Sequence, residues 1–294
     1  MATPRGGFVW HELMTTDPDA AIRFYSKVIG WQVEAWKGDP TYRIWTAGGA
    51  PMGGLMRLPE EARRMSAPPS WLTYVFTPDV DATVRRATSL GGRVLAAARN
   101  LPDVGRFAVL ADPQGAAFSV YKPAREQSGV KQGTPGEFSW HELATTDYRA
   151  AWNFYRALFG WEATEALDLG PAGTYWMFRS AGQGRGGIYN KPPEMPVANW
   201  LPYILVRNAD QTAETAKRLG ARILMGPMDV PTGDRIAAGM DPQGAAFAVF
   251  SLGAKPAARA APTRRPAKRP QTKKKATAKK KPAKKKARKA KRRR

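Results

Sequence analysis

The 294-residue sequence contains no cysteine and no apolar run long enough to cross a membrane. Without cysteine the chain can form neither a disulfide nor a thiolate metal site. A membrane-spanning helix needs about 20 mostly apolar residues, so we expect no membrane insertion. The first residues also lack a basic segment followed by an apolar one, which predicts no secretory signal and a cytoplasmic location, with association with the nucleoid as an alternative.

Acidic residues are absent from the end of the chain. Residues 255–294 contain 21 Lys and Arg and neither Asp nor Glu, while the whole chain has 47 basic residues, 24 acidic residues and a net charge of +23. Subtracting the 21 leaves 26 basic against 24 acidic groups in residues 1–254, a net charge of about +2. The sequence therefore predicts a nearly neutral globular part followed by a polycationic tail.

The sequence repeats itself once. Residues 8–31 match residues 138–161 at 14 of 24 positions, and residues 111–122 match residues 240–251 at 8 of 12. A Gly-Gly pair, a Trp-Leu-x-Tyr segment and a Leu-Gly-x-Arg segment recur between them in the same order. This order indicates a duplication. We expect a first domain at 1–122, a Pro- and Gly-rich linker at 123–137, a second domain at 138–253 and a disordered basic tail at 254–294.

Each copy shows the pattern β-α-β-β-β twice. In the first copy, Asp17 has the position of an N-cap and Pro18 that of the first helical residue, and Gly30 ends this helix. The predicted strands lie at 8–13, 31–36, 42–47, 54–58 and 71–77 and near residues 94, 107 and 118, with a second helix at 79–90. Asp-Pro-Gln-Gly, at 112–115 and again at 241–244, is typical of the turn of a hairpin. The predicted fold class is α+β, with four βαβββ modules.

Several of these features together resemble one family. They are the opening strand, the Asp four residues after its Leu, the Phe-Tyr helix ending in Gly-Trp, and the terminal Asp-Pro-x-Gly hairpin. They resemble the glyoxalase/bleomycin resistance/dioxygenase group, the vicinal oxygen chelate superfamily, over roughly residues 8–122 and 138–251. The resemblance implies paired modules whose curled sheets form a cup around a ligand.

The resemblance also indicates where metal ligands lie in metal-using members. The three family positions fall, in the two repeats, on Trp10, Trp71, Ser119, Trp140, Trp200 and Ala248. An indole N–H only donates hydrogen bonds, and alanine has no donor atom for a metal. We therefore expect no divalent metal at these positions and no cofactor. Instead, Trp10 with Trp71, and Trp140 with Trp200, are predicted to line each cup and bind an apolar, aromatic or cationic small molecule, unless these indoles simply fill the cup as packed core.

The chain has two histidines, and each is followed by a glutamate. Side chains alternate along a strand, so His11 and Leu13 share one face and Trp10 and Glu12 the other. We expect His11 and His141 to lie outside the cup as hydrogen-bonded structural residues. Glu12 and Glu142 are expected inside the cup, and two roles are open for them. They are catalytic bases or anions facing a cationic ligand, or they are bonded to an arginine such as Arg43 or Arg106.

The tail resembles the Lys/Ala/Pro-rich arms of linker-histone-like proteins. Its dense cations suit the phosphates of nucleic acid, and it has no aromatic residue for stacking on bases. A solubilising tail or attachment to acidic lipids are the alternatives. The predicted nucleic-acid-binding residues are Lys273, Lys274, Lys275, Lys279, Lys280, Lys281, Lys284, Lys285, Lys286, Arg288, Lys289, Lys291, Arg292, Arg293 and Arg294.

Three functional hypotheses follow from these patterns. The first is a metal-independent protein that binds small molecules in its cups and non-specific nucleic acid through its tail. The second is an enzyme of the glyoxalase or dioxygenase type with a non-standard active site that uses Glu12 and Glu142 for proton transfer, or that recruits a metal at other positions. The third is an architectural DNA-binding protein whose globular part is a scaffold.

Overall fold

The computed structural model describes residues 5–125 and 133–253, and these form one compact unit. The predicted tail at 254–294 lies outside the described residues. Within the described ranges, no helix has the length and hydropathy that a membrane crossing requires.

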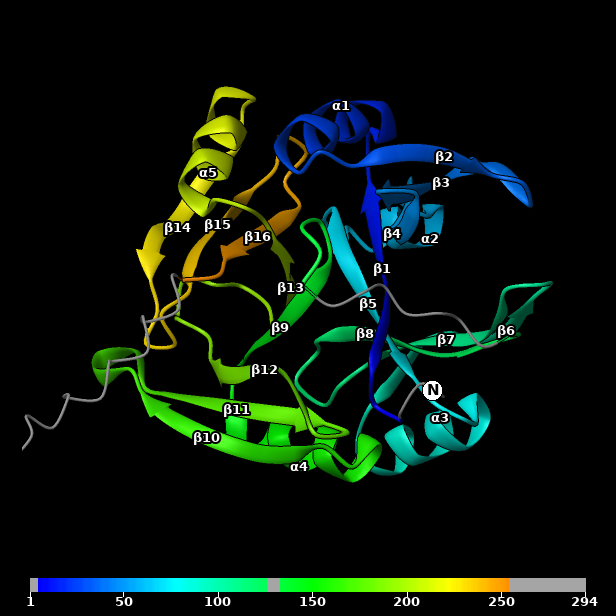
Figure 1. Ribbon diagram of the computed structural model, residues 1–294. Coiled ribbons are helices and arrows are strands. Elements are labelled where there is room, and N and C mark those ends of the chain that lie inside the picture. The colour runs from blue at the N-terminus through cyan, green and yellow to red at the C-terminus, as the bar shows by residue number, and fades with distance from the viewer. Residues whose placement is uncertain (1–4, 126–132, 254–294) are drawn as a thin grey trace, which may run out of the picture. The chain divides into compact units, whose positions relative to one another are not determined.

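The predicted β-α-β-β-β pattern is present four times (Figure 1). The first repeat consists of β1 (Phe8–Thr15), α1 (Pro18–Val28), β2 (Gln32–Trp36), β3 (Asp39–Ala47), β4 (Ala50–Arg57), α2 (Glu60–Arg64), β5 (Ser70–Phe76), α3 (Val80–Ser89), β6 (Arg93–Leu101), β7 (Gly105–Ala111) and β8 (Ala117–Pro123). The second consists of β9 (Phe138–Thr145), α4 (Tyr148–Phe159), β10 (Glu162–Asp168), a 3₁₀ turn (Gly170–Ala172), β11 (Thr174–Ser180), β12 (Gln183–Asn190), β13 (Asn199–Leu205), α5 (Ala209–Arg218), β14 (Arg222–Asp229), β15 (Arg235–Met240) and β16 (Ala246–Ser251).

Each repeat forms one mixed sheet of eight strands. The strand orders are β2-β3-β4-β1-β5-β8-β7-β6 and β10-β11-β12-β9-β13-β16-β15-β14, so the two repeats have the same topology. The two modules of a repeat meet where β1 pairs antiparallel with β5, and likewise β9 with β13. The chain therefore has the tandem α+β fold that the sequence predicts.

Local sequence signals explain where the helices and hairpins begin. The Asp17 side chain accepts a hydrogen bond from the backbone N–H of Ala20, as the predicted N-cap requires, and Pro18 begins α1. In the Asp-Pro-Gln-Gly turn, the Oδ1 atom of Asp112 accepts from the backbone N–H groups of Gln114 and Ala116 at 2.9 Å each. This turn leads β7 into β8, which pair antiparallel.

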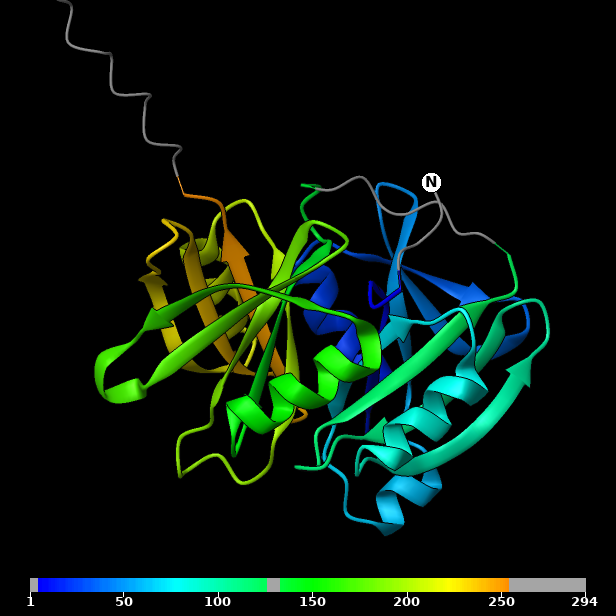
Figure 2. The same ribbon diagram turned by 90° about the horizontal axis from the view of Figure 1, so that it is seen from below.

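The two repeats pack against each other (Figure 2) and share their hydrophobic cores. One core joins α1 and β1–β4 of the first repeat to β13, α5, β15 and β16 of the second, with Phe247 packed against Phe24 and Tyr25. The other joins β5, α3, β7 and β8 of the first repeat to α4, β9, β11 and β12 of the second. Burying one large apolar side chain contributes about 1.5–3 kcal/mol, so each repeat depends on the other for much of its stability.

Candidate functional site

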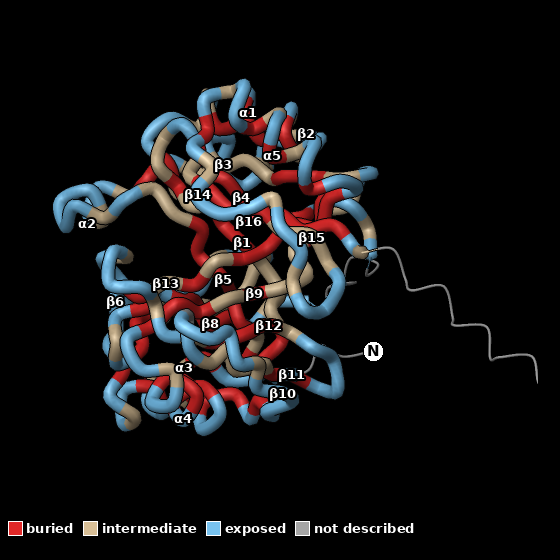
Figure 3. Tube along the Cα trace, turned by 90° about the vertical axis from the view of Figure 1, so that its left-hand side faces the viewer, coloured by how far each residue is buried: buried red, intermediate tan, exposed pale blue. Residues whose placement is uncertain are grey.

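The two faces of each sheet have different neighbours. The helices and the opposite repeat cover one face, where Leu13 belongs to a shared core. On the other face, Leu72, Tyr74 and Tyr121 form a separate cluster with the half-buried Trp10. We call this face of the first sheet the first cup, and the equivalent face of the second sheet, with Tyr203 and Trp140, the second cup. The centres of both sheets are buried (Figure 3).

In the first cup a carboxyl group is held by two tyrosines. Glu12 is 8% exposed, and its Oε2 accepts from the Tyr42 hydroxyl at 2.8 Å while its Oε1 accepts from the Tyr74 hydroxyl at 3.1 Å. The Tyr42 hydroxyl in turn accepts from Nε1 of Trp10 at 3.0 Å. The indole, the phenol and the carboxyl group thus form a chain of hydrogen bonds across β1, β3 and β5.

The second cup contains the same arrangement. Glu142 accepts from the hydroxyls of Tyr175 and Tyr203 at 2.8 Å each, and Tyr175 accepts from Nε1 of Trp140 at 2.7 Å. Glu142 keeps more solvent contact than Glu12, because it is only partly buried. The duplicated chain has therefore kept one polar centre in each cup.

Glycines make room for these tyrosines. A Cβ atom on Gly54 would overlap the Tyr42 hydroxyl, and one on Gly187 would overlap the Tyr175 ring. Both glycines lie on the strand next to the glutamate, since Gly54 pairs with Glu12 and Gly187 with Glu142. The repeated Gly-Gly pair of the sequence is thus part of the site.

Burial sets the protonation behaviour of this centre. It raises the pKa of both Glu12 and Glu142, and the tyrosine hydrogen bonds oppose the rise because they favour the charged carboxylate. Burial and the neighbouring carboxylate also raise the pKa of Tyr42 and Tyr175, which keeps the phenols protonated as donors. A carboxyl group of this kind can accept a proton from a bound molecule or balance a bound cation.

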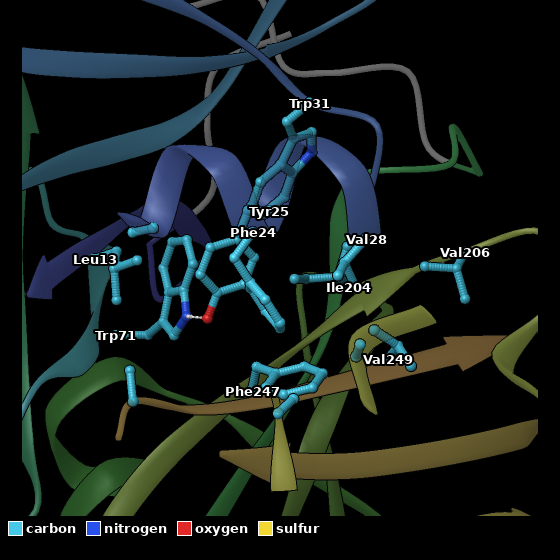
Figure 4. Packing of buried hydrophobic residues seen from close by; sticks show 14 of the residues in the cluster. Leu13, Phe24, Tyr25, Val28, Trp31, Trp71, Ile204, Val206, Phe247 and Val249 are labelled. Atoms are coloured by element: carbon cyan, nitrogen blue, oxygen red, sulfur yellow. Dashed lines mark hydrogen bonds between the residues drawn. The ribbon is translucent and has the colours of Figure 1, made fainter. Parts of the chain in front are cut away.

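Two of the predicted ligand-binding tryptophans lie elsewhere, and the prediction that they line the cups is wrong. Trp71 pairs with Leu13 across β1 and β5, so both side chains lie on the helix face of the sheet. Its Nε1 donates to the Tyr25 hydroxyl of α1 at 3.2 Å (Figure 4). Trp200 likewise donates to Tyr155 of α4, at 2.9 Å. Trp10 and Trp140 are the tryptophans that lie on the cup face.

The remaining family positions carry small residues. Ser119 pairs with Tyr74, is fully buried, and donates its hydroxyl to the Ala108 carbonyl at 3.0 Å. Ala248 is fully buried in the cluster of the second cup. On β5 the residue opposite Glu12 is Leu72, which has no metal-binding atom either.

These donor sets do not fit a divalent metal. Each cup offers one carboxylate, and the residues around it present protonated phenols and an indole N–H, which donate hydrogen bonds. Across residues 5–125 and 133–253, no three His, Cys, Asp or Glu side chains are placed to hold a metal ion.

Glu12 is not hydrogen-bonded to Arg43 or Arg106, the two arginines named for it. Arg106 forms a bidentate salt bridge with Asp81, with N···O distances of 2.7 and 2.8 Å. Nη1 of Arg43 is buried without a hydrogen-bond partner. The partners of Glu12 are tyrosines that sequence reasoning did not single out. Their signal was present, because Tyr42 and Tyr74 recur as Tyr175 and Tyr203 in the second repeat.

The histidines lie outside the cups, as predicted, but each bonds to the other. The Nε2 atoms of His11 and His141 are 2.7 Å apart and both rings are buried. Phe138 stacks on His11 and Phe8 on His141. Nδ1 of His141 is 3.1 Å from the Arg185 carbonyl, so it carries the proton that this bond needs. Nε2 of neutral His141 then accepts from Nε2–H of His11.

Burial lowers the pKa of both histidines, that of His141 to about 3. The pair is therefore neutral at physiological pH and joins the central strands of the two repeats.

A second kind of contact joins the repeats at each Asp-Pro-Gln-Gly turn. The hydroxyl of Tyr25 donates to Asp241 and that of Tyr155 to Asp112, both at 3.1 Å.

An open groove of about 620 Å³ lies outside both cups. It runs along α4 and is lined by Trp152, Trp161, Trp176, Arg149 and Arg156, among others. Trp176 directly follows Tyr175 on β11, so its side chain lies on the opposite face of the sheet from the second cup. The groove and the carboxyl centre are therefore separate features.

Comparison with known proteins gives the following similarities. A family described as "Glyoxalase-like domain" matches residues 10–121, and the "Glyoxalase/Bleomycin resistance protein/Dioxygenase superfamily" matches residues 137–249. "Putative glyoxylase CFP32" of Mycobacterium tuberculosis is 33% identical over 82% of this chain and 93% of that protein. "Anthracycline biosynthesis protein DauV" of Streptomyces sp. is 30% identical over 84% of this chain and 94% of that protein. The Mn(II)-bound glyoxalase from Novosphingobium aromaticivorans, 20% identical, has a similar fold, with a TM-score of 0.58 over 84% of this chain and 82% of that chain.

Proposed function

The chain belongs to the glyoxalase/bleomycin resistance protein/dioxygenase superfamily, and on this basis we propose that its cups bind apolar, aromatic or cationic small organic molecules without a metal ion. The observation that supports this is the carboxyl centre found in both cups. Glu12 and Glu142 are each held by two tyrosine hydroxyls beside a tryptophan. Aromatic side chains offer a stacking surface, and the single carboxylate offers one polar anchor.

Metal independence is supported by the residues at the family's ligand positions. A mononuclear site needs at least three well-placed donor atoms, and among the described residues no such set of His, Cys, Asp or Glu is present around Glu12 or Glu142. The Mn(II)-bound glyoxalase shares the fold of this chain, so the fold itself does not decide the question. The side chains in the cups favour binding by stacking and hydrogen bonding.

Saturation-transfer NMR with three probes that share a benzene ring tests this proposal. Phenol is neutral, benzyltrimethylammonium is cationic and benzoate is anionic. We expect transfer to phenol and benzyltrimethylammonium in buffer with EDTA, and little transfer to benzoate because the carboxylates repel it. The matched control is the double variant Glu12→Gln/Glu142→Gln, which keeps the shape and removes the charge. Absence of transfer to all three probes, or transfer only after Mn(II) is added, would contradict the proposal.

A catalytic role for the same carboxyl groups is the second candidate, an enzyme of the glyoxalase or dioxygenase type with a non-standard site. The raised pKa of Glu12 and Glu142 favours it, because a base with a raised pKa removes protons more effectively near neutral pH. Hydroxyacetone in D₂O is a suitable probe. A catalytic base would take up a proton from its α-carbon and return a deuteron. Exchange that is equally fast in the Gln double variant would exclude this role.

For the tail we propose non-specific binding of nucleic acid, and its composition supports this proposal. Residues 255–294 hold 21 cations and no acidic residue, whereas the globular part is close to neutral. Cations at this density release counterions from a duplex, which drives binding without reading the sequence. If the cups bind nothing, this tail activity on an inert scaffold is the architectural alternative.

A further inference from the structure

The two cups differ in the charge that faces their carboxyl groups. In the first cup, the guanidinium of Arg99 lies over the Phe107 ring, 5.0 Å from its centroid, and its positive charge acts on Glu12. Arg99 pairs with Phe107 across β6 and β7, and the same pairing in the second repeat joins Met228 to Ile236. The second cup therefore has a thioether and an aliphatic chain where the first has a cation and an aromatic ring.

The second cup also has an aromatic ring beside its carboxyl centre at a position where the first cup has a thioether. Tyr189 lies two residues after Gly187 on β12 and therefore on the same face, where it stacks with Tyr175 at 6.0 Å between centroids. The matching residue of β4 is Met56, since Met56 pairs with Met14 as Tyr189 pairs with Ala144. Four aromatic side chains therefore surround Glu142, and they are Trp140, Tyr175, Tyr189 and Tyr203.

From these differences we infer that the second cup is an aromatic cage that selects organic ammonium ions, whereas the first cup is not. This inference deepens the proposed function of the cups and rests on it. Aromatic faces attract a cation through their quadrupoles, and a nearby carboxylate adds direct attraction. Trp140, Tyr175 and Tyr189 each keep partial contact with solvent. In the first cup, the guanidinium of Arg99 over Phe107 adds a positive charge that disfavours a second cation.

Choline and 3,3-dimethylbutan-1-ol test the inference, because they differ only in a quaternary nitrogen against a carbon. Isothermal titration of the full chain should give one choline site, with at least tenfold weaker binding of the alcohol. Met228→Arg puts the missing cation into the second cup and should weaken choline binding at least tenfold. Met228 is 46% exposed, so the longer side chain can be accommodated. Met65→Arg, on a 72% exposed residue of the first repeat, adds the same charge elsewhere and should leave choline binding unchanged.

The reverse exchange tests the first cup. Arg99→Met/Met56→Tyr removes the cation of the first cup and adds the tyrosine of the second, and the number of choline sites per chain should rise from one to two. Choline binding that is no tighter than binding of the alcohol, or that Met228→Arg does not weaken, would overturn the inference. If either of these results is found but the cups bind phenol, the proposed function stands and only the cation selectivity fails. If they bind none of these probes, both fail together.

Discussion

Acidification should destabilise this protein through the histidine pair that joins its two repeats. The fold holds His141 neutral with a pKa of about 3, against about 6.5 in an unfolded chain, because the ring is buried between Phe8 and His11. Between these two values the unfolded chain binds more protons than the folded one. The stability contributed by the neutral pair is therefore present at pH 7 and is lost as the pH falls.

The magnitude follows from the two pKa values. Going from pH 7 to pH 5, an unfolded histidine becomes almost fully protonated while the folded His141 stays neutral, which costs roughly 2 kcal/mol at about 1.4 kcal/mol per pKa unit. His11 acts in the same direction, since its pKa is lowered too. Arg185 faces the pair: its carbonyl bond to His141 opposes the drop in the pKa of that histidine, and its positive charge contributes to the drop. The loss should therefore be at least about 2 kcal/mol.

Urea unfolding followed by tryptophan fluorescence at pH 7, 6 and 5 measures this loss. Other groups also titrate, so the quantity to compare is the difference from the variant His11→Gln/His141→Gln. Glutamine places an amide near the Nε2 position and does not titrate. Wild-type protein should lose at least about 2 kcal/mol more than the variant between pH 7 and pH 5. Parallel pH profiles for the two proteins would refute the reasoning.

Other expected outcomes concern the cups and the tail. Glu12→Gln/Glu142→Gln should stabilise the protein more at pH 8 than at pH 5, which urea unfolding at both pH values measures. A carboxyl group whose pKa is raised by folding destabilises the folded protein once the pH rises through that pKa, and glutamine removes this cost. Trp71→Ala should cost about 3–5 kcal/mol in the same assay, since it empties part of the shared core, and unchanged stability would place this indole outside the core. Gly54→Ala should lower the melting temperature, because Tyr42 occupies the space of the new Cβ atom, and calorimetry checks this. Full-length protein should bind unrelated DNA duplexes in anisotropy titrations, with log K falling by about 9 per log unit of salt concentration if about ten cations engage phosphates. Deletion of 255–294 should abolish DNA binding. DNA binding retained by the truncated protein would assign that binding to the globular part.

Much of the fold could be predicted because its signals are local and occur twice. The N-cap at Asp17, the proline after it and the Asp-Pro-Gln-Gly turn each fix a short segment, and all three lie where predicted. Alternation along the first strand correctly placed Glu12 and Trp10 on one face and His11 on the other. These features need only the residues near them in sequence.

The errors and omissions concern long-range pairing. The face of Trp71 depends on the register between β1 and β5, which sets it opposite Leu13, and no local pattern gives that register. The shared cores were not predicted either, because they form between residues that lie far apart in the sequence. Tyr25 bonds to Asp241, which is 216 residues away, and only the packing of one repeat against the other brings them together.

The most direct test of metal-free binding in the cups is a titration of EDTA-dialysed protein, shown to be metal-free by elemental analysis, with benzyltrimethylammonium. Wild-type protein should bind with the same Kd, within about twofold, before and after Mn(II) is added, because the cups lack a metal-binding donor set. Binding should weaken at least tenfold in Glu12→Gln/Glu142→Gln, which corresponds to about 1.4 kcal/mol. A Kd that appears only with Mn(II), or one that the double variant leaves unchanged, would contradict the account.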